Sequence, residues 1–323
     1  MYNERGMVEG LLQHLVRKID DKAELVGFEA LTGGVSAKTT SFTIKRADQS
    51  IKKLILRQFS QDIVRIQPHV ADKEFVLLDA LYNAGVSVPR PYYYGANGDF
   101  SEVPHRSETS YIVIDYIDGK LCLSPPDIDG YIRALAAKLV TIHSVDLNLP
   151  QFENIHWPEG ATVYEAWKKP SQPMDDSLQE PKIRKFFEWA PDYVSRDLCL
   201  IHGDLWPGNL ICNEAGIAGI IDWEDSTIGD PLYDLAVMRL DILWAFGHEA
   251  MDRFTQYYAD TTKLDLFLLP YWDLCAALRP MHKIKDWAEG YVTFGRPDIT
   301  EDKMRKAHAF FVDQAFKELD SRS

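Results

Sequence analysis

The segments IHGDLWPGNL (residues 201–210) and GIIDWED (residues 219–225) hold the polar residues that decide how this 323-residue chain is interpreted. Short β-prone stretches are expected at residues 200–201, 210–212 and 219–223, because apolar residues are concentrated there. His202, Asp204 and Asn209 then fall in a loop between two short strands, and Asp222 follows the apolar residues of the third. Polar residues gathered in such loops predict a functional site.

The order and spacing of these residues resemble those of kinases. In protein kinases, a His precedes an Asp and an Asn in the order D-x-x-x-x-N, and a metal-binding Asp follows on a nearby strand. Asp204 and Asn209 have this spacing, with His-Gly-Asp for His-Arg-Asp and Asp-Trp-Glu for Asp-Phe-Gly. Together with GDPLYDLA at residues 229–236, the segments resemble the aminoglycoside phosphotransferase and choline kinase family. The resemblance covers about residues 31–236.

This resemblance implies an α+β, two-lobed, protein-kinase-like fold. We expect a small β-rich nucleotide-binding lobe over residues 1–115 and a larger, mainly helical catalytic and acceptor-binding lobe over residues 116–323. Apolar periodicity predicts a short helix over about residues 7–16. Strands are expected at residues 24–31, 38–46, 53–58 and 111–117, and helices at 70–83, 131–145, 231–246, 249–259, 266–287 and 300–319, with Pro270 and Pro280 expected to interrupt the helix at 266–287.

The chemistry of phosphoryl transfer accounts for the residue types in the two segments. Enzymes mainly position the reactants and neutralise phosphate charge in this reaction. We expect Asp204 to orient the acceptor hydroxyl and to accept its proton. Asn209 and Asp222 are expected to bind Mg²⁺, which prefers oxygen ligands and retains waters and phosphates. His202 is expected to shape the catalytic loop through a hydrogen bond.

The first lobe is expected to supply the nucleotide contacts. The turn at Gly33, Gly34 and Ser36 falls where the family has its phosphate-covering turn, although an ordinary hairpin would look the same. Arg57 stands where the resemblance calls for a phosphate-binding Lys, with Glu74 as its partner, and a surface ion pair is the alternative. The backbone of the predicted hinge strand is expected to bind the purine; its residues are Ile114, Asp115 and Tyr116.

The second lobe offers aromatic and acidic residues for the acceptor. Residues 1–115 carry 14 basic and 15 acidic side chains, whereas residues 116–323 carry 21 and 34, so nearly all of the net charge of −14 lies in the second part. Carboxylates that face a site attract a cationic acceptor. The candidates, each of which has core packing or solvent exposure as an alternative, are Glu224, Asp225, Asp241, Trp244, Trp272 and Trp287.

Composition excludes several other classes. The negative net charge argues against nucleic acid as a partner, because phosphate contacts need clustered cations. No apolar run is long enough to span a membrane, and no export signal is seen at the start. The four widely spaced cysteines are typical of reduced thiols in a cytoplasmic protein: Cys122, Cys199, Cys212 and Cys275.

Three functions remain open at this stage. The first is an ATP- and Mg²⁺-dependent kinase that phosphorylates a hydroxyl of a small molecule, such as an amino sugar, a choline-like amine or another metabolite. The second is a macrolide-type kinase that uses GTP. The third is a catalytically inactive, kinase-like nucleotide-binding protein, suggested by Arg57 in place of Lys. The sequence does not identify the acceptor or the oligomeric state.

Overall fold

The computed structural model describes residues 4–31, 37–95, 110–153, 155, 157, 170, 173–190 and 198–321. The chain forms two compact units. The first comprises residues 1–118 with 148–156, and the second residues 119–147 with 157–323. The division falls three residues after the expected one, and residues 148–156, which we expected in the second lobe, group with the first unit. Each unit is described by itself below.

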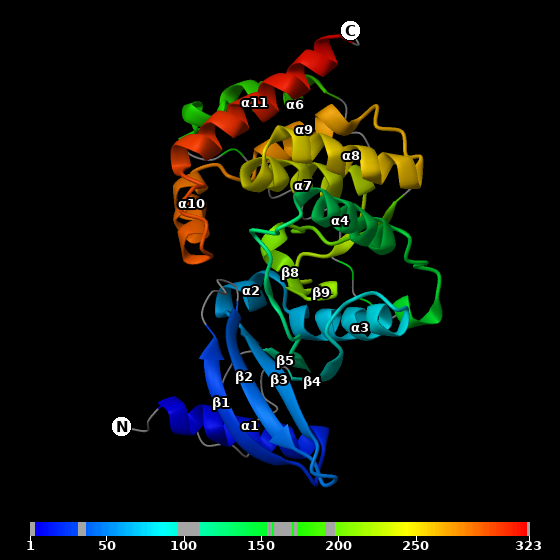
Figure 1. Cartoon of the computed structure of the whole chain (residues 1–323), viewed down its shortest axis with the longest axis vertical. Helices are drawn as coiled ribbons and strands as arrows, with labels where there is room; N and C mark the ends of the chain where they lie inside the picture. The colour runs from blue at the N-terminus through cyan, green and yellow to red at the C-terminus, as the bar shows by residue number, and fades with distance from the viewer. Residues whose placement is uncertain are drawn as a thin grey trace. The chain divides into compact units, whose positions relative to one another are not determined.

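An antiparallel sheet forms the centre of the first unit (Figure 1). Its strand order is β1-β2-β3-β5-β4. The strands are β1 (Glu24–Leu31), β2 (Ala37–Lys45), β3 (Ile51–Phe59), β4 (Pro91–Gly95) and β5 (Tyr111–Asp115). Apolar and polar residues alternate over parts of β2 and β3, so one face of the sheet is covered and the other is more open.

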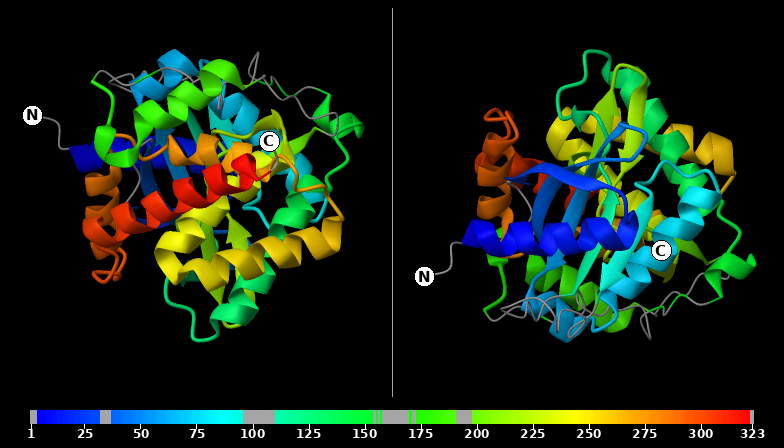
Figure 2. Two further views of the ribbon diagram at one scale, coloured as in Figure 1. Left: turned by 90° about the horizontal axis from the view of Figure 1, so that it is seen from above. Right: turned by 90° about the horizontal axis from the view of Figure 1, so that it is seen from below.

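Helix α1 (Glu4–Ile19) lies across one face of this sheet (Figure 2, right). Leu12, Leu15 and Val16 are fully or almost fully buried and form one apolar cluster with Phe42 and Ile44 of β2. The remaining helices of the unit are α2 (Gln61–Ile66) and α3 (Val70–Asn83), and α3 packs against β4 and β5. Helices thus bury apolar residues of the sheet.

Helices make up most of the second unit (Figure 1). They are α4 (Ile128–His143), α6 (Glu180–Trp189), α7 (Pro231–Phe246), α8 (His248–Thr262), α9 (Leu269–Ala277), α10 (Ile284–Thr293) and α11 (Glu301–Asp320). Helix α7 is buried along 15 of its 16 residues and packs against α8, α9 and α11. A helix that is buried on all sides is the core of its unit.

Short strands connect the helices of the second unit. Strands β6 (Lys120–Leu121), β8 (Leu210–Asn213) and β9 (Gly216–Ile220) form one antiparallel sheet, and β7 (Cys199–Ile201) pairs with β10 (Thr227–Gly229) in a second. The loop at residues 202–209 follows β7, and the segment at residues 221–226 follows β9. The two polar segments of the sequence therefore lie in consecutive connections between these two small sheets.

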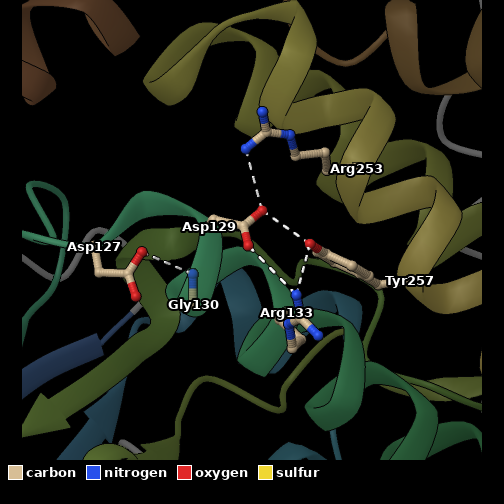
Figure 3. A network of polar contacts seen from close by, with 6 residues as sticks. All are labelled: Asp127, Asp129, Gly130, Arg133, Arg253 and Tyr257. Carbon is tan, nitrogen blue, oxygen red and sulfur yellow. Dashed lines mark hydrogen bonds and ion pairs between the residues drawn. The ribbon is translucent and has the colours of Figure 1, made fainter.

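A polar network joins α4 to α8 (Figure 3). The Asp129 carboxylate accepts hydrogen bonds from Tyr257 at 2.8 Å, from Arg253 at 3.2 Å and from Arg133 at 3.4 Å. Asp127 caps the start of α4 by accepting from the backbone N–H of Gly130 at 3.0 Å. The two arginines are more than half exposed, so this network stabilises the packing of α4 on α8 only modestly.

The α+β class and the lobe types predicted from the sequence are confirmed, with differences in detail. Pro270 lies in the first turn of α9 instead of interrupting a helix, because a proline there loses no helical hydrogen bond. The predicted helix does break near Pro280. The third β-prone stretch ends at Ile220, so residues 221–223 are outside the strand. None of the helices in the described part of the chain is long and apolar enough to cross a membrane.

Candidate active site

The carboxylate of Asp234 holds the start of the loop that begins at His202. Asp234, in the first turn of α7, accepts the backbone N–H of His202 at 2.7 Å and that of Gly203 at 2.9 Å. His143 of α4 contacts the same carboxylate at 3.3 Å and binds the Tyr258 hydroxyl at 2.7 Å. Asp234 is fully buried, and its pKa is lowered because hydrogen bonds and His143 outweigh the cost of burial. The carboxylate therefore fixes the backbone from which Asp204 projects.

Gly203 allows the loop to pass close to the second polar segment. Its φ is +86°, in the region that favours glycine, and a Cβ at this position would lie 2.4 Å from the carbonyl oxygen of Asp225. The two segments that the sequence analysis paired are thus in backbone contact. A larger residue would have to push them apart.

His202 makes the backbone hydrogen bond that the sequence analysis expected. Its Nε2 lies 3.0 Å from the carbonyl oxygen of Ile221, and its Nδ1 lies 3.4 Å from the backbone N–H of Asp204. A neutral imidazole protonated at Nε2 satisfies both contacts. Burial lowers the pKa of His202, and its ring packs 4.6 Å from that of Trp223. This histidine therefore links the two polar segments from within the core.

Asn209 and Asp204 are joined directly. The side-chain amide of Asn209 donates to the backbone carbonyl of Asp204 at 2.9 Å, and the backbone carbonyl of Asn209 accepts from the backbone N–H of Ile221 at 3.0 Å. With the amide nitrogen used in this way, no described residue donates to the side-chain oxygen of Asn209. Asp222, one residue beyond Ile221, has a φ of +70°, which is uncommon outside glycine.

These residues fit a Mg²⁺ ion. The amide oxygen of Asn209, which accepts no hydrogen bond from a described residue, and the carboxylate of Asp222 are two hard oxygen ligands of the type that Mg²⁺ prefers; water and phosphates would supply the others. The part of the chain that the structure describes has no group of three or more His, Cys, Asp or Glu side chains that could hold a metal.

The carboxylate of Asp204 contacts a cation that the sequence analysis missed. Arg279, in the turn after α9, donates from Nη2 to Asp204 Oδ1 and from Nη1 to Asp241 Oδ2 at 3.2 Å. The side chains of Arg279 and Asp241 are each only 7% exposed, whereas that of Asp204 is 33% exposed. The guanidinium carbon of Arg279 lies 5.7 Å from the centre of the Trp287 ring. Asp241, predicted to face a cationic acceptor, is thus paired with an arginine of the protein itself.

Burial sets the charge balance of this group. It raises the pKa of Asp204 to about 7 and that of Asp241 to about 6, against the opposing effect of the Arg279 charge. The two carboxylates in turn raise the pKa of Arg279, despite its burial. A carboxylate whose pKa lies near neutrality can exchange a proton with a hydroxyl at physiological pH.

The other predicted acceptor residues are spread over the second unit. Trp287 is half-buried and packs edge-on against Trp244, whose indole N–H donates to the Met304 carbonyl at 3.1 Å. Trp272 is 4% exposed and packs against Tyr233 and Tyr271, so it belongs to the core, as large aromatic residues on buried helices usually do. Glu224 is also buried, and Asp225 is exposed.

The predicted nucleotide residues of the first unit form a buried ion pair. Arg57 of β3 donates to Glu74 of α3, and the two residues are 8% and 1% exposed. The alternative of a surface pair is therefore wrong. The free-energy cost of removing two charges from water can exceed the attraction between them. The buried pair is therefore weak evidence that these residues serve only to stabilise the fold. The turn residues Gly33, Gly34 and Ser36 lie outside the described part of the chain.

In the predicted hinge strand, backbone N–H groups that were expected to bind the purine already donate hydrogen bonds within the protein. The N–H of Asp115 donates to the Arg90 carbonyl at 2.8 Å, and that of Tyr116 donates to the Lys53 carbonyl at 3.3 Å. Ile114 is paired with Ile55 in the sheet. Purine recognition by the N–H groups of residues 115 and 116 would thus first require breaking these bonds, because each N–H is a single donor.

A comparison of sequences identifies the family. The sequence model described as "Phosphotransferase enzyme family" matches residues 28–278, more than half of the chain. The chain belongs to this family. Acyl-CoA dehydrogenase family member 11 of Homo sapiens is 28% identical over 75% of this phosphotransferase and 33% of its own length. Homoserine kinase of Methylocella silvestris is 28% identical over half of each chain. The phosphotransferase thus spans a third or less of the length of the acyl-CoA dehydrogenase relatives that it matches.

Solved structures show the same fold. Choline kinase LicA from Streptococcus pneumoniae has a TM-score of 0.58 at 19% identity, over 97% of this phosphotransferase and 99% of that chain. Aminoglycoside phosphotransferase APH(4)-Ia, in a ternary complex with AMP-PNP and hygromycin B, has a TM-score of 0.57 at 16% identity, over 94% and 97%. An aminoglycoside 2'-phosphotransferase-IIIa mutant with GDP has a TM-score of 0.59 at 16% identity, over 98% and 96%.

Proposed function

We propose that this phosphotransferase moves the γ-phosphate of ATP to a hydroxyl group of a small molecule. The observation that carries the proposal is the hydrogen bond from the Asn209 side-chain amide to the backbone carbonyl of Asp204, which ties the residue proposed to bind the metal to the residue proposed as the base. Fold and family support a phosphotransferase, and the related proteins named above include a homoserine kinase and a choline kinase.

Each residue then has a distinct role. Asp204 accepts the proton of the acceptor hydroxyl as its oxygen bonds to phosphorus. The side-chain oxygen of Asn209 and the carboxylate of Asp222 hold Mg²⁺, which supplies charge neutralisation for the phosphates. In the first unit, Arg57 binds phosphate as a permanent cation, with Glu74 holding it in place. Gly33, Gly34 and Ser36 are proposed to contact the same phosphates through their backbone and the hydroxyl.

A magnesium-dependent screen tests this function. Release of ADP from ATP, and of GDP from GTP, is followed with amino sugars, macrolides, amino alcohols and hydroxylated amino acids as acceptors. GTP is included because the solved structures of this fold contain both adenine and guanine nucleotides. Turnover that depends on one acceptor class supports the proposal. A chain that binds neither nucleotide with Mg²⁺ contradicts it.

Variants separate the roles. Asp204→Asn should abolish transfer and leave nucleotide binding within about twofold, because the proposed role of this carboxylate involves the acceptor and not the nucleotide. Asp222→Ala should weaken binding of ATP only when Mg²⁺ is present, as measured by calorimetry. Arg57→Lys should retain more nucleotide affinity than Arg57→Ala, because only the lysine keeps a positive charge at this position that can contact Glu74. Wild-type turnover by Asp204→Asn would contradict the role of that carboxylate.

An inactive nucleotide-binding protein is the second candidate. It is favoured by the ion pair between Arg279 and Asp204, which engages the proposed base. The two candidates differ in one measurement, because both bind nucleotide but only the kinase consumes it. Nucleotide binding without turnover on any acceptor, and without hydrolysis, would favour the inactive protein.

A further inference from the structure

Two buried arginines form ion pairs in or next to helix α7. Arg279 lies in the turn after α9 and bridges Asp204 of the catalytic loop to Asp241 of α7. Arg239, two residues before Asp241 on α7, donates to both carboxylate oxygens of Asp273 at 3.0 Å. The arginines are 6% and 5% exposed. The two arginines are therefore buried to nearly the same extent, but they contact different carboxylates.

The contacts of Arg279 fix one oxygen of Asp204 and leave the other open. Its guanidinium donates to Oδ1, and no described residue donates a hydrogen bond to Oδ2. Nη1 of the same guanidinium donates to Asp241 at 3.2 Å, and the ring of Trp287 lies next to the guanidinium. A guanidinium held at two points is a rigid support, because its donors lie in one plane. The free oxygen of Asp204 is thereby given a single direction.

Stability alone does not explain this arrangement. A buried arginine with two carboxylates leaves one negative charge unbalanced, and such groups stabilise a fold less than apolar residues of the same volume do. Arg239 and Asp273 form a balanced pair nearby, so this part of the fold is already bridged. One of the two carboxylates that share the Arg279 charge is the one that the proposed reaction uses.

We infer that Arg279 is a positioning residue that aims Oδ2 of Asp204 at the acceptor hydroxyl, with Asp241 as the anchor that holds Arg279. This inference rests on the proposed function. A displacement of a catalytic group by about 1 Å can reduce turnover about 100-fold. Loss of Arg279 should therefore reduce kcat, and it should leave nucleotide affinity unchanged, because Arg279 contacts no predicted nucleotide-binding residue.

The test compares Arg279→Met with its matched control Arg239→Met in the full chain. First, calorimetry with ATP and Mg²⁺ establishes nucleotide binding by the wild type. Next, kcat and KM are measured for hydrolysis by water and for the acceptor found in the screen. Reaction of Asp204 with a carbodiimide and an amine, read by peptide mass spectrometry, reports separately whether the carboxylate is held. Arg279→Met with Asp241→Leu removes both buried charges together and serves if the single variant does not fold.

We expect Arg279→Met to reduce kcat about 100-fold with nucleotide affinity within twofold, and to increase the labelling of Asp204 several-fold. Arg279→Lys should recover part of kcat, and Arg239→Met should change neither kcat nor the labelling. Unchanged labelling in Arg279→Met, or an equal loss of kcat in Arg239→Met, would overturn the inference. A wild type that does not bind ATP would overturn the proposed function as well, and calorimetry detects this before any variant is made.

Discussion

Asp234 holds the backbone N–H groups of His202 and Gly203 with its two carboxylate oxygens, one bond to each. The loop that carries Asp204 is therefore positioned by the first turn of α7. Asp230 caps that turn by accepting the N–H of Leu232 at 2.8 Å, so the helix start is itself fixed. The loop conformation is thus a property of the helix beneath it.

Replacement of Asp234 should loosen this loop. Asp234→Ala leaves two buried N–H groups without acceptors, and we expect a loss of about 2–4 kcal/mol in the free energy of unfolding. Asp234→Asn retains one acceptor oxygen and should lose about half as much. Urea denaturation followed by circular dichroism measures both. An Asp234→Ala variant as stable as the wild type would show that the hydrogen bonds are absent in solution.

Gly203→Ala should be more harmful than its backbone angle alone predicts. A methyl group there would lie 2.4 Å from the Asp225 carbonyl oxygen, in addition to the strain of a positive φ. Gly216 also has a positive φ, of +109°, but has open space where a Cβ would be added. We expect Gly216→Ala to cost about 1 kcal/mol and Gly203→Ala clearly more. Equal losses in thermal unfolding would mean that the two polar segments are not in contact.

Removing the hydroxyl group from two buried tyrosines should change the stability of the fold in opposite directions. Tyr291 is 4% exposed, and its hydroxyl has no hydrogen-bond partner among the described residues. Tyr291→Phe should therefore stabilise the fold, by about 1 kcal/mol. Tyr258 binds His143 at 2.7 Å, so Tyr258→Phe should destabilise it by a similar amount. Thermal melts compare the two; a loss of stability in Tyr291→Phe would indicate that its hydroxyl has a partner.

Stability should depend on pH through Asp298. Hydrogen bonds from Arg296 lower the pKa of this carboxyl to about 2, below its ordinary value of 3.8. The contribution of the ion pair is present above about pH 4 and is lost as the pH falls toward 2. Because Asp298 is half exposed, solvent screening keeps the effect small. Asp298→Asn should flatten the fall in stability between pH 4 and 2, measured by urea denaturation.

Arg296→Met serves as the second arm of that experiment. Arg296 also donates to the carbonyl of Ala245 at 2.9 Å and to that of Leu123. The variant should therefore flatten the same pH range and additionally lose stability at pH 7, which Asp298→Asn should do to a smaller extent. A slope that persists in both variants would assign the pH dependence to other carboxylates.

The sequence was informative where neighbours in the chain are also neighbours in space. Spacing alone placed Asp204 and Asn209 together, and the structure joins them through one hydrogen bond. Apolar patterning predicts most of the long helices and, in the first unit, strands β1, β2, β3 and β5. Helix α6 and strand β4 were missed, because proline-rich surroundings conceal short elements.

Arg279 could not be found in this way. It lies 75 residues from Asp204, in a turn with no motif, and only the packing of α9 on α7 brings it to the catalytic loop. A general signal did exist, because a charged residue in an apolar segment needs a partner, but the sequence does not identify that partner. The same limit applies to Asp241, whose acidity suggested a cationic acceptor until the structure paired it with an arginine.

Helix α7 carries Asp234 in its first turn and Asp241 two turns later. The first residue holds the backbone of the loop at residues 202–209, and the second contacts Arg279, which in turn contacts the carboxylate of Asp204. A small rotation of this one helix would therefore move both supports of Asp204 together and preserve their relative placement. A core substitution that shifts α7 should therefore act on Asp204 through both contacts, without altering any residue of the two polar segments.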